Sequence, residues 1–157
     1  MTMTDVSVRK SVIVNAPIEK AFDVFTTGIG TWWPPDHHIL EAELAEMVFE
    51  PRAGGHVYDR GVDGSECRWA RVLAYDPPNR VVFSWDINLQ WHIEADANKT
   101  SEIEVRFLAE GANRTRVELE HRNLSRHGEG WEAMRAAVES EGGWRRGLDA
   151  FAEAVRA

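Results

Sequence analysis

The chain has very little cysteine and no long hydrophobic run, and each scarcity excludes a class of protein. Its 157 residues include a single cysteine, Cys67, so neither an intramolecular disulfide nor a zinc site made of thiolates alone is available. Nowhere do about 18 consecutive apolar residues occur, which is the length that a membrane-spanning helix needs. The first residues also lack the basic and apolar segments of an export signal. These absences predict a cytoplasmic protein with no membrane span.

Positive charge is also scarce. The chain carries 18 Lys and Arg against 26 Asp and Glu, which gives a formal net charge of −8. Such a chain repels phosphate backbones, and no run of basic residues offsets this, since Arg145 and Arg146 form only a pair. We therefore expect no nucleic-acid partner.

The motifs of nucleotide, calcium and hydrolase sites are absent. Trp33 stands where a dinucleotide fingerprint that begins at Gly28 needs its third glycine. A calcium loop that begins at Asp59 would have Ala70 in place of the bidentate glutamate. The hydrolase G-x-S-x-G elbow and the H-E-x-x-H and C-x-x-C patterns do not occur. The sequence therefore predicts no cofactor.

The six histidines do not suggest a metal centre. His37 and His38 are neighbours in a proline-rich loop, where side chains diverge, so we interpret them as solvated loop residues and expect no metal site. His121 follows Val117 and Leu119 on the apolar face of a predicted strand. Two interpretations remain open for it: an imidazole that positions or deprotonates a ligand, or a core histidine that is hydrogen-bonded near the strand end.

The predicted elements form one α+β domain over residues 6–157, with a disordered tail at residues 1–5. Alternating valines from Val6 to Val14 predict a strand, and Pro17 opens a helix that ends near Gly28. Residues 40–122 predict about six antiparallel strands, one of them a long alternation over residues 81–93. Two helical stripes follow, and the second is the longer. Helices at both ends of an antiparallel sheet predict a curled sheet with the last helix across its concave face.

Tryptophan is the abundant aromatic residue, with seven Trp against six Phe and two Tyr. A tryptophan must fill space while its indole N–H finds a partner, so this number indicates either a large core or an apolar cavity with polar groups. We expect aromatic residues of one strand face and of the helices to converge in the space under the last helix. A solidly filled core and an open cavity both fit this pattern.

Glu66 and Arg68 share one face of a predicted strand with Ala70 and Val72. If that face is concave, the pair becomes a ligand anchor, whereas it is a surface pair if Cys67 and Trp69 face inward. The sequence leaves the choice open.

The chain resembles the START-like (SRPBCC) superfamily. Within that superfamily it is similar to the bacterial relatives of the C-terminal domain of the activator of the ninety-kilodalton heat-shock protein (Hsp) ATPase. The resemblance covers about residues 6–155 and depends on the order and spacing of short segments. These segments are Ala16–Pro17, residues 32–34 (WWP), 49–55 (FEPRAGG), 63–66 (DGSE) with Trp69, 72–78 (VLAYDPP), 82–85 (VFSW), 117–121 (VELEH) and 143–144 (GW).

The resemblance implies a helix-grip fold, with two short helices after the first strand, a curved sheet around the C-terminal helix and an internal apolar cavity. Superfamily members bind lipids, hormones or polyketide-like molecules, and some are cyclases. The candidate cavity residues are Trp32, Trp33, Trp69, Phe83, Trp85, Trp91, His121, Trp144, Leu148 and Phe151. The candidate polar anchors are Glu66, Arg68 and His121. A segment at residues 129–139 is expected to cap the cavity or to form a dimer interface.

Three functional hypotheses follow from these expectations. The first is a protein that binds a small apolar or aromatic ligand and has no assigned reaction. The second is a protein-interaction module that stimulates a heat-shock ATPase, which would make a chaperone its partner. The third is an enzyme of the cyclase or hydrolase kind, which needs at least two polar groups in one cavity. The resemblance also allows a homodimer.

Overall fold

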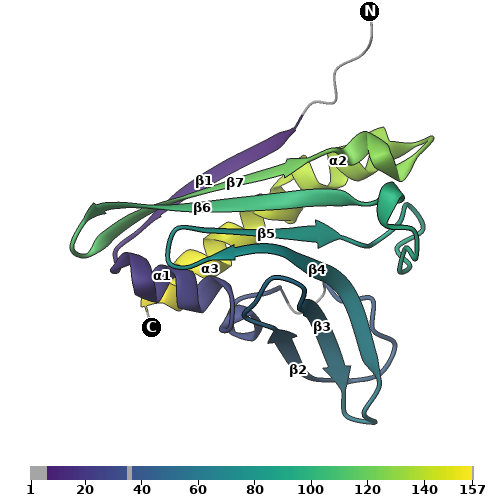
Figure 1. Cartoon of the computed structure of the whole chain (residues 1–157), viewed down its shortest axis with the longest axis horizontal. Helices are drawn as coiled ribbons and strands as arrows, with labels where there is room; N and C mark the ends of the chain where they lie inside the picture. The colour runs from purple at the N-terminus through teal and green to yellow at the C-terminus, as the bar shows by residue number, and fades with distance from the viewer. Residues whose placement is uncertain (1–6, 35–36, 157) are drawn as a thin grey trace, which may run out of the picture.

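The computed structural model describes residues 7–34 and 37–156, so the tail expected at residues 1–5 lies outside the described residues. Seven strands form one antiparallel sheet in the order β1-β7-β6-β5-β4-β3-β2 (Figure 1). The strands are β1 (Val8–Val14), β2 (Leu44–Phe49), β3 (His56–Gly61), β4 (Glu66–Asp76), β5 (Arg80–Trp85), β6 (Ser101–Gly111) and β7 (Arg114–Arg122). The helices are α1 (Ile18–Phe25), α2 (Trp131–Glu139) and α3 (Arg146–Arg156).

Four short helical turns complete the described part of the chain. They are η1 (Ile29–Thr31), η2 (Ala97–Lys99), η3 (Leu124–His127) and η4 (Glu141–Arg145). None of the helices in residues 7–34 and 37–156 is long and apolar enough to cross a membrane.

The sheet curls, and α3 lies across it (Figure 1). The helix contacts α1 and β1, so the C-terminal helix and the first strand of the chain meet on the same side of the fold. Its buried residues Leu148, Phe151 and Val155 form one stripe, as the helical spacing predicts. Phe151 packs edge-on against Phe25 of α1 at a centroid distance of 5.3 Å. The predicted α+β fold, with a curved antiparallel sheet and a C-terminal helix, is confirmed.

The long alternation over residues 81–93 does not form one strand. β5 ends at Trp85, and the chain then turns back on itself through an isolated bridge between Ile87 and Ile93. The cause lies in Asn88, whose side-chain oxygen accepts the backbone N–H groups of Gln90 and His92 at 2.9 and 3.0 Å. This local turn replaces the sheet ladder, as asparagine side chains commonly do. The prediction of a continuous strand was wrong because alternation alone does not reveal such a turn.

A bulge in β4 changes which side chains face inward. Val57 of β3 pairs with Ala70, but the next residue, Tyr58, pairs with Arg68, so Trp69 is the extra residue. Trp69 and Ala70 are therefore both buried, although they are adjacent in sequence. A bulge shifts the alternation by one residue and bends the strand. Neither of the two registers considered for this strand holds along its whole length.

The junction between α2 and α3 depends on a glycine. Gly143 has non-helical backbone angles, with φ −90° and ψ −127°. A Cβ atom at this position would lie 2.4 Å from the carbonyl oxygen of Val138 and 2.6 Å from that of Ala137. Any other residue would thus collide with the end of α2. The close passage redirects the chain and places Trp144, in η4, just before the last helix.

A charged cluster holds three strands together on the face opposite the apolar core. Glu104 of β6 is buried, and its carboxylate accepts hydrogen bonds from Arg80 of β5, Arg106 of β6 and Arg122 of β7. Burial alone would raise the pKa of Glu104, but the hydrogen bonds from Arg80, Arg122 and Arg106 outweigh it and lower this pKa to about 2. The ionised carboxylate therefore stabilises the folded sheet.

We expect Glu104→Gln to lower the free energy of unfolding by about 2 kcal/mol at neutral pH, because three guanidinium groups lose a charged partner. The folded pKa lies below the ordinary value of 4.5, so this stability is present above pH 4.5 and is lost as the pH falls toward 2. Urea denaturation of both proteins between pH 7 and 2.5 measures it. The free energies of unfolding of the two proteins should approach each other as the pH falls toward 2.5. A difference between them that stays constant with pH would contradict the assignment to this carboxylate.

Candidate functional site

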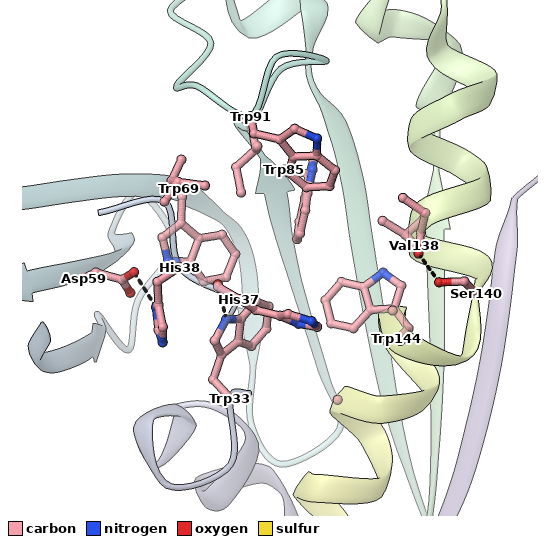
Figure 2. A pocket seen from close by; sticks show the side chains of 16 residues that line it. Trp33, His37, His38, Asp59, Trp69, Trp85, Trp91, Val138, Ser140 and Trp144 are labelled. Carbon is pink, nitrogen blue, oxygen red and sulfur yellow. Dashed lines mark hydrogen bonds and ion pairs between the residues drawn. The ribbon is translucent and has the colours of Figure 1, made fainter. Parts of the chain in front are cut away.

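A cavity of about 470 Å³ opens between the sheet and the start of α3. Its wall includes residues of β3, β4 and β5, the segment before β2, the loop after β5 and the α2–α3 junction. Figure 2 shows the labelled side chains around this space. Ala137 and Val138 of α2 line it, so the segment expected to cap the cavity contributes to its wall. The volume is within the range of roughly 300–1,000 Å³ that is typical of small-molecule pockets.

Four tryptophans on this wall contact each other in a closed cycle, which we call the tryptophan ring: Trp33, Trp69, Trp85 and Trp144. The centroid distances along the cycle are 5.0, 5.9, 5.9 and 5.8 Å, starting from the pair Trp33–Trp69. Three of the four contacts are edge-to-face, the favoured aromatic geometry. Such packing holds each indole in a defined orientation.

Trp91 is the fifth tryptophan on the cavity wall, and it differs from the ring because 46% of its surface is exposed. It follows the Asn88 turn, and its φ of 62° lies in the left-handed region. Bulky residues rarely adopt this conformation, since the side chain then crowds the backbone. The turn thus holds an exposed indole at the edge of the cavity.

The other candidate cavity residues lie behind the ring, in the packed core. Trp32 donates its indole N–H to the Val24 carbonyl at 2.9 Å and packs against Phe25 and Phe151. Phe83, Leu148 and Phe151 are fully buried and do not line the cavity. They support the wall.

Glu66 and Arg68 lie on the exposed side of β4. Their side chains pair with each other at 3.2 Å, and the Arg68 guanidinium stands over the Tyr58 ring. Neither residue lines the cavity.

His121 is fully buried and fixes Trp144 through a chain of hydrogen bonds. The indole N–H of Trp144 donates to His121 Nδ1 at 3.0 Å, so the imidazole proton must be on Nε2. Nε2 then donates to the Ser101 hydroxyl at 2.7 Å, which in turn donates to His127 Nε2 at 2.7 Å. Burial, with a contribution from His127, lowers the pKa of His121 to about 3. Both of its nitrogens bind protein groups, which leaves none for a ligand.

His38 and Asp59 form a pair that the sequence does not predict. The sequence indicates a solvated loop for His37 and His38, and that expectation was wrong for His38, because its side chain is 11% exposed. Its Nδ1 lies 2.7 Å from Asp59 Oδ2, and both residues line the cavity. Asp59 stands two residues after the buried Val57 on β3, so the alternation of a strand puts both side chains on the same inward face. This is the signal from which the sequence could have placed the Asp59 carboxylate inward.

Two residues that line the cavity each have a buried polar atom with no hydrogen-bond partner in the described part of the chain: Asp59 Oδ1 and Trp85 Nε1. One is an acceptor and the other a donor. Unpaired polar groups in a protein interior are costly, so they indicate a place where a ligand or water supplies the missing bond. No group of three or more His, Cys, Asp or Glu suited to a metal ion occurs among the described residues.

Comparison with known proteins places these features in a family. The profile described as "Activator of Hsp90 ATPase homolog 1-like protein" matches residues 15–156. The chain shares 41% identity with Txn09, described as an anthrahydroquino-gamma-pyrone synthase and solved in a complex, over 96% of this chain and 97% of that one, with a TM-score of 0.67. No curated protein matches the chain.

Two further solved structures share the fold. CalC from Micromonospora echinospora, described as a self-sacrificing resistance protein, is 26% identical over 96% of this chain and 94% of that one, with a TM-score of 0.64. Protein NE0264 from Nitrosomonas europaea covers the same shares at 11% identity and a TM-score of 0.68, which is a likeness of fold alone.

We expect His121→Leu to lower the free energy of unfolding by about 2 kcal/mol at pH 7.5, because it leaves the Trp144 N–H unpaired in the interior and removes one of the two hydrogen bonds of the Ser101 hydroxyl. Urea denaturation followed by tryptophan fluorescence measures this change. The control is Glu118→Gln, an exposed position on the same strand, which should shift stability by less than about 0.5 kcal/mol.

The same variant tests how the free energy of unfolding depends on pH. Because the folded pKa of His121 is far below the ordinary 6.5, the unfolded chain gains a proton that the folded chain does not, and stability falls as the pH drops from 6.5 toward 3. Between pH 6.5 and 5 the decline should be shallower in His121→Leu than in the wild type. Equal slopes of the free energy of unfolding against pH in the two proteins would show that His121 does not titrate in this way.

Proposed function

Because the chain belongs to the family of activator of Hsp90 ATPase homolog 1-like proteins, within the START-like superfamily, we propose that it binds a flat, polycyclic aromatic ketone of the polyketide type in its cavity. The observation that carries this proposal is the tryptophan ring in a cavity lined also by Asp59, with unpaired polar atoms on Asp59 and Trp85.

The shape and chemistry of the wall favour this ligand class. Indole surfaces stack on planar aromatic systems, and they do so best when the indoles are held in place. The Trp85 N–H is suited to a carbonyl oxygen, and Asp59 Oδ1 is suited to a hydroxyl. A hydroxylated aromatic ketone carries both groups, whereas a fatty acid has neither a planar body nor a hydroxyl donor along its chain.

A second function has a specific observation in its favour, namely ring closure on such a ligand. Txn09, with 41% identity over nearly the whole chain, is described as a pyrone synthase. This supports an enzyme of the cyclase kind among the three hypotheses. The co-chaperone hypothesis has only the family's name in its support.

We expect 2-hydroxyanthraquinone to quench the tryptophan fluorescence of the protein at micromolar concentrations, and palmitate to leave it unchanged. Trp33→Leu should weaken binding about tenfold, because it removes one member of the ring and its stacking surface. The matched control is Trp131→Leu, a part-buried tryptophan that does not line the cavity, and its affinity should equal that of the wild type.

Fluorescence titration gives the dissociation constants. Equal affinities for the dye and palmitate would contradict the proposed ligand class, and so would an equal loss in Trp33→Leu and Trp131→Leu. The absence of any dye binding would rule out the proposed function.

A further inference from the structure

We propose that His38 and Asp59 act as a general-base pair that ionises a phenolic hydroxyl of the bound molecule and so starts closure of an oxygen-containing ring. This inference rests on the proposed function, since it needs a hydroxylated aromatic ketone in the cavity. The substrate class is an aryl 1,3-diketone with a hydroxyl group ortho to its side chain.

The geometry of the pair leaves one nitrogen for the ligand. An ionised carboxylate only accepts hydrogen bonds, so the proton of His38 must be on Nδ1, where it is donated to Asp59 Oδ2 at 2.7 Å. In the neutral imidazole Nε2 carries a lone pair, and the hydrogen bond to Asp59 is the one found for this ring within residues 7–34 and 37–156. A buried carboxylate orients the imidazole and stabilises the imidazolium that forms when Nε2 takes a proton.

Asp59 itself indicates a built site. Its residue surface is 1% exposed, and its Oδ1 has no partner among the described residues. Burying a carboxylate with half of its acceptors unused destabilises a fold, so the fold alone does not explain it. Figure 2 shows the His38–Asp59 pair at one side of the pocket and Trp144 at the other.

Three other titratable groups lie near the pair or line the same interior: Cys67, His37 and His121. Cys67 of β4 pairs with Asp59 across the strands, and burial, together with the negative charge of Asp59, raises the pKa of its thiol to about 11. His37, from the same loop as His38, is exposed but also lines the cavity, and its Nε2 lies 3.5 Å from a guanidinium nitrogen of Arg146. His121 is excluded as the base because both of its nitrogens are bound within the protein.

The proposed reaction balances without an oxidant or reductant. His38 Nε2 takes the phenolic proton, and the oxygen forms a bond to the distal carbonyl carbon of the side chain. The carbonyl π pair moves to its oxygen, which takes the proton back from His38. His38 then removes a proton from the neighbouring carbon, whose electron pair forms the ring double bond, and the new hydroxyl leaves with that proton as water. The Trp85 N–H is suited to hold the second carbonyl oxygen during these steps.

The test uses the ionisation of bound 2-hydroxyanthraquinone, whose neutral and ionised forms differ in visible absorbance. At a pH equal to the pKa of the free dye, the ratio of ionised to neutral dye on the wild-type protein should be about tenfold higher than in solution. In His38→Gln and Asp59→Asn it should fall to the solution value or below. His56→Gln replaces a histidine of the same strand as Asp59 that does not line the cavity, and it should match the wild type.

Tryptophan quenching, measured in the same samples, separates the two proposals. Dye that binds to the wild type without a rise in its ionised fraction overturns the general-base pair and leaves the proposed function standing. An ionised fraction of bound dye that stays as high in His38→Gln as in the wild type overturns the general-base pair as well. If the dye does not quench the tryptophan fluorescence of the wild type, the result counts against the proposed function. His38 lies in a loop, so His38→Gln decides the matter even if Asp59→Asn does not fold.

Discussion

The close passage of Gly143 over the end of α2 is the constraint on which the cavity depends. No side chain fits between its Cα and the carbonyl groups of Ala137 and Val138, so the chain turns there and Trp144 of η4, just before α3, takes a fixed direction. A straight helix through this region would place that indole elsewhere. The hydrogen bond from Trp144 to His121 then secures the position, and the remaining tryptophans of the ring pack against it.

The interior contains two sets of polar groups with different physical roles. In the chain Trp144–His121–Ser101–His127, each bond determines the direction of the next, and burial keeps His121 neutral. That set makes one wall rigid. His38, Asp59 and Trp85 line one cavity, and Asp59 Oδ1 and the Trp85 N–H have no hydrogen-bond partner among the described residues. A pre-organised binding site requires both a rigid wall and polar groups that still have hydrogen bonds to offer a ligand.

Much of the fold could be predicted from local periodicity. The stripe of Leu148, Phe151 and Val155 and the alternation in β7 each arise from contacts with one neighbouring layer, so the spacing of residues reveals them. The bulge at Trp69 and the turn at Asn88 could not be predicted in this way, because each depends on a pairing partner or on a side-chain hydrogen bond. Both interrupt an alternation that the sequence shows as continuous.

The candidate site was less accessible to sequence reasoning. The tryptophans are conspicuous by their number, but the sequence does not distinguish Trp33, which lines the cavity, from its neighbour Trp32, which packs in the core. His38 and Asp59 are 21 positions apart and meet only because the segment before β2 folds over β3. Alternation from Val57 indicates an inward Asp59, yet only the tertiary structure supplies its partner.

The tryptophan ring also has a consequence for the order in which the molecule is made. Its four members come from the segment before β2, from β4, from β5 and from η4, so they span most of the chain. A growing chain that has not yet reached Trp144 lacks one quarter of the cycle and the indole that His121 holds. Contacts between such distant segments form late in folding. The cavity is therefore a product of the nearly completed chain, and no shorter fragment that ends before Trp144 is expected to hold a ligand.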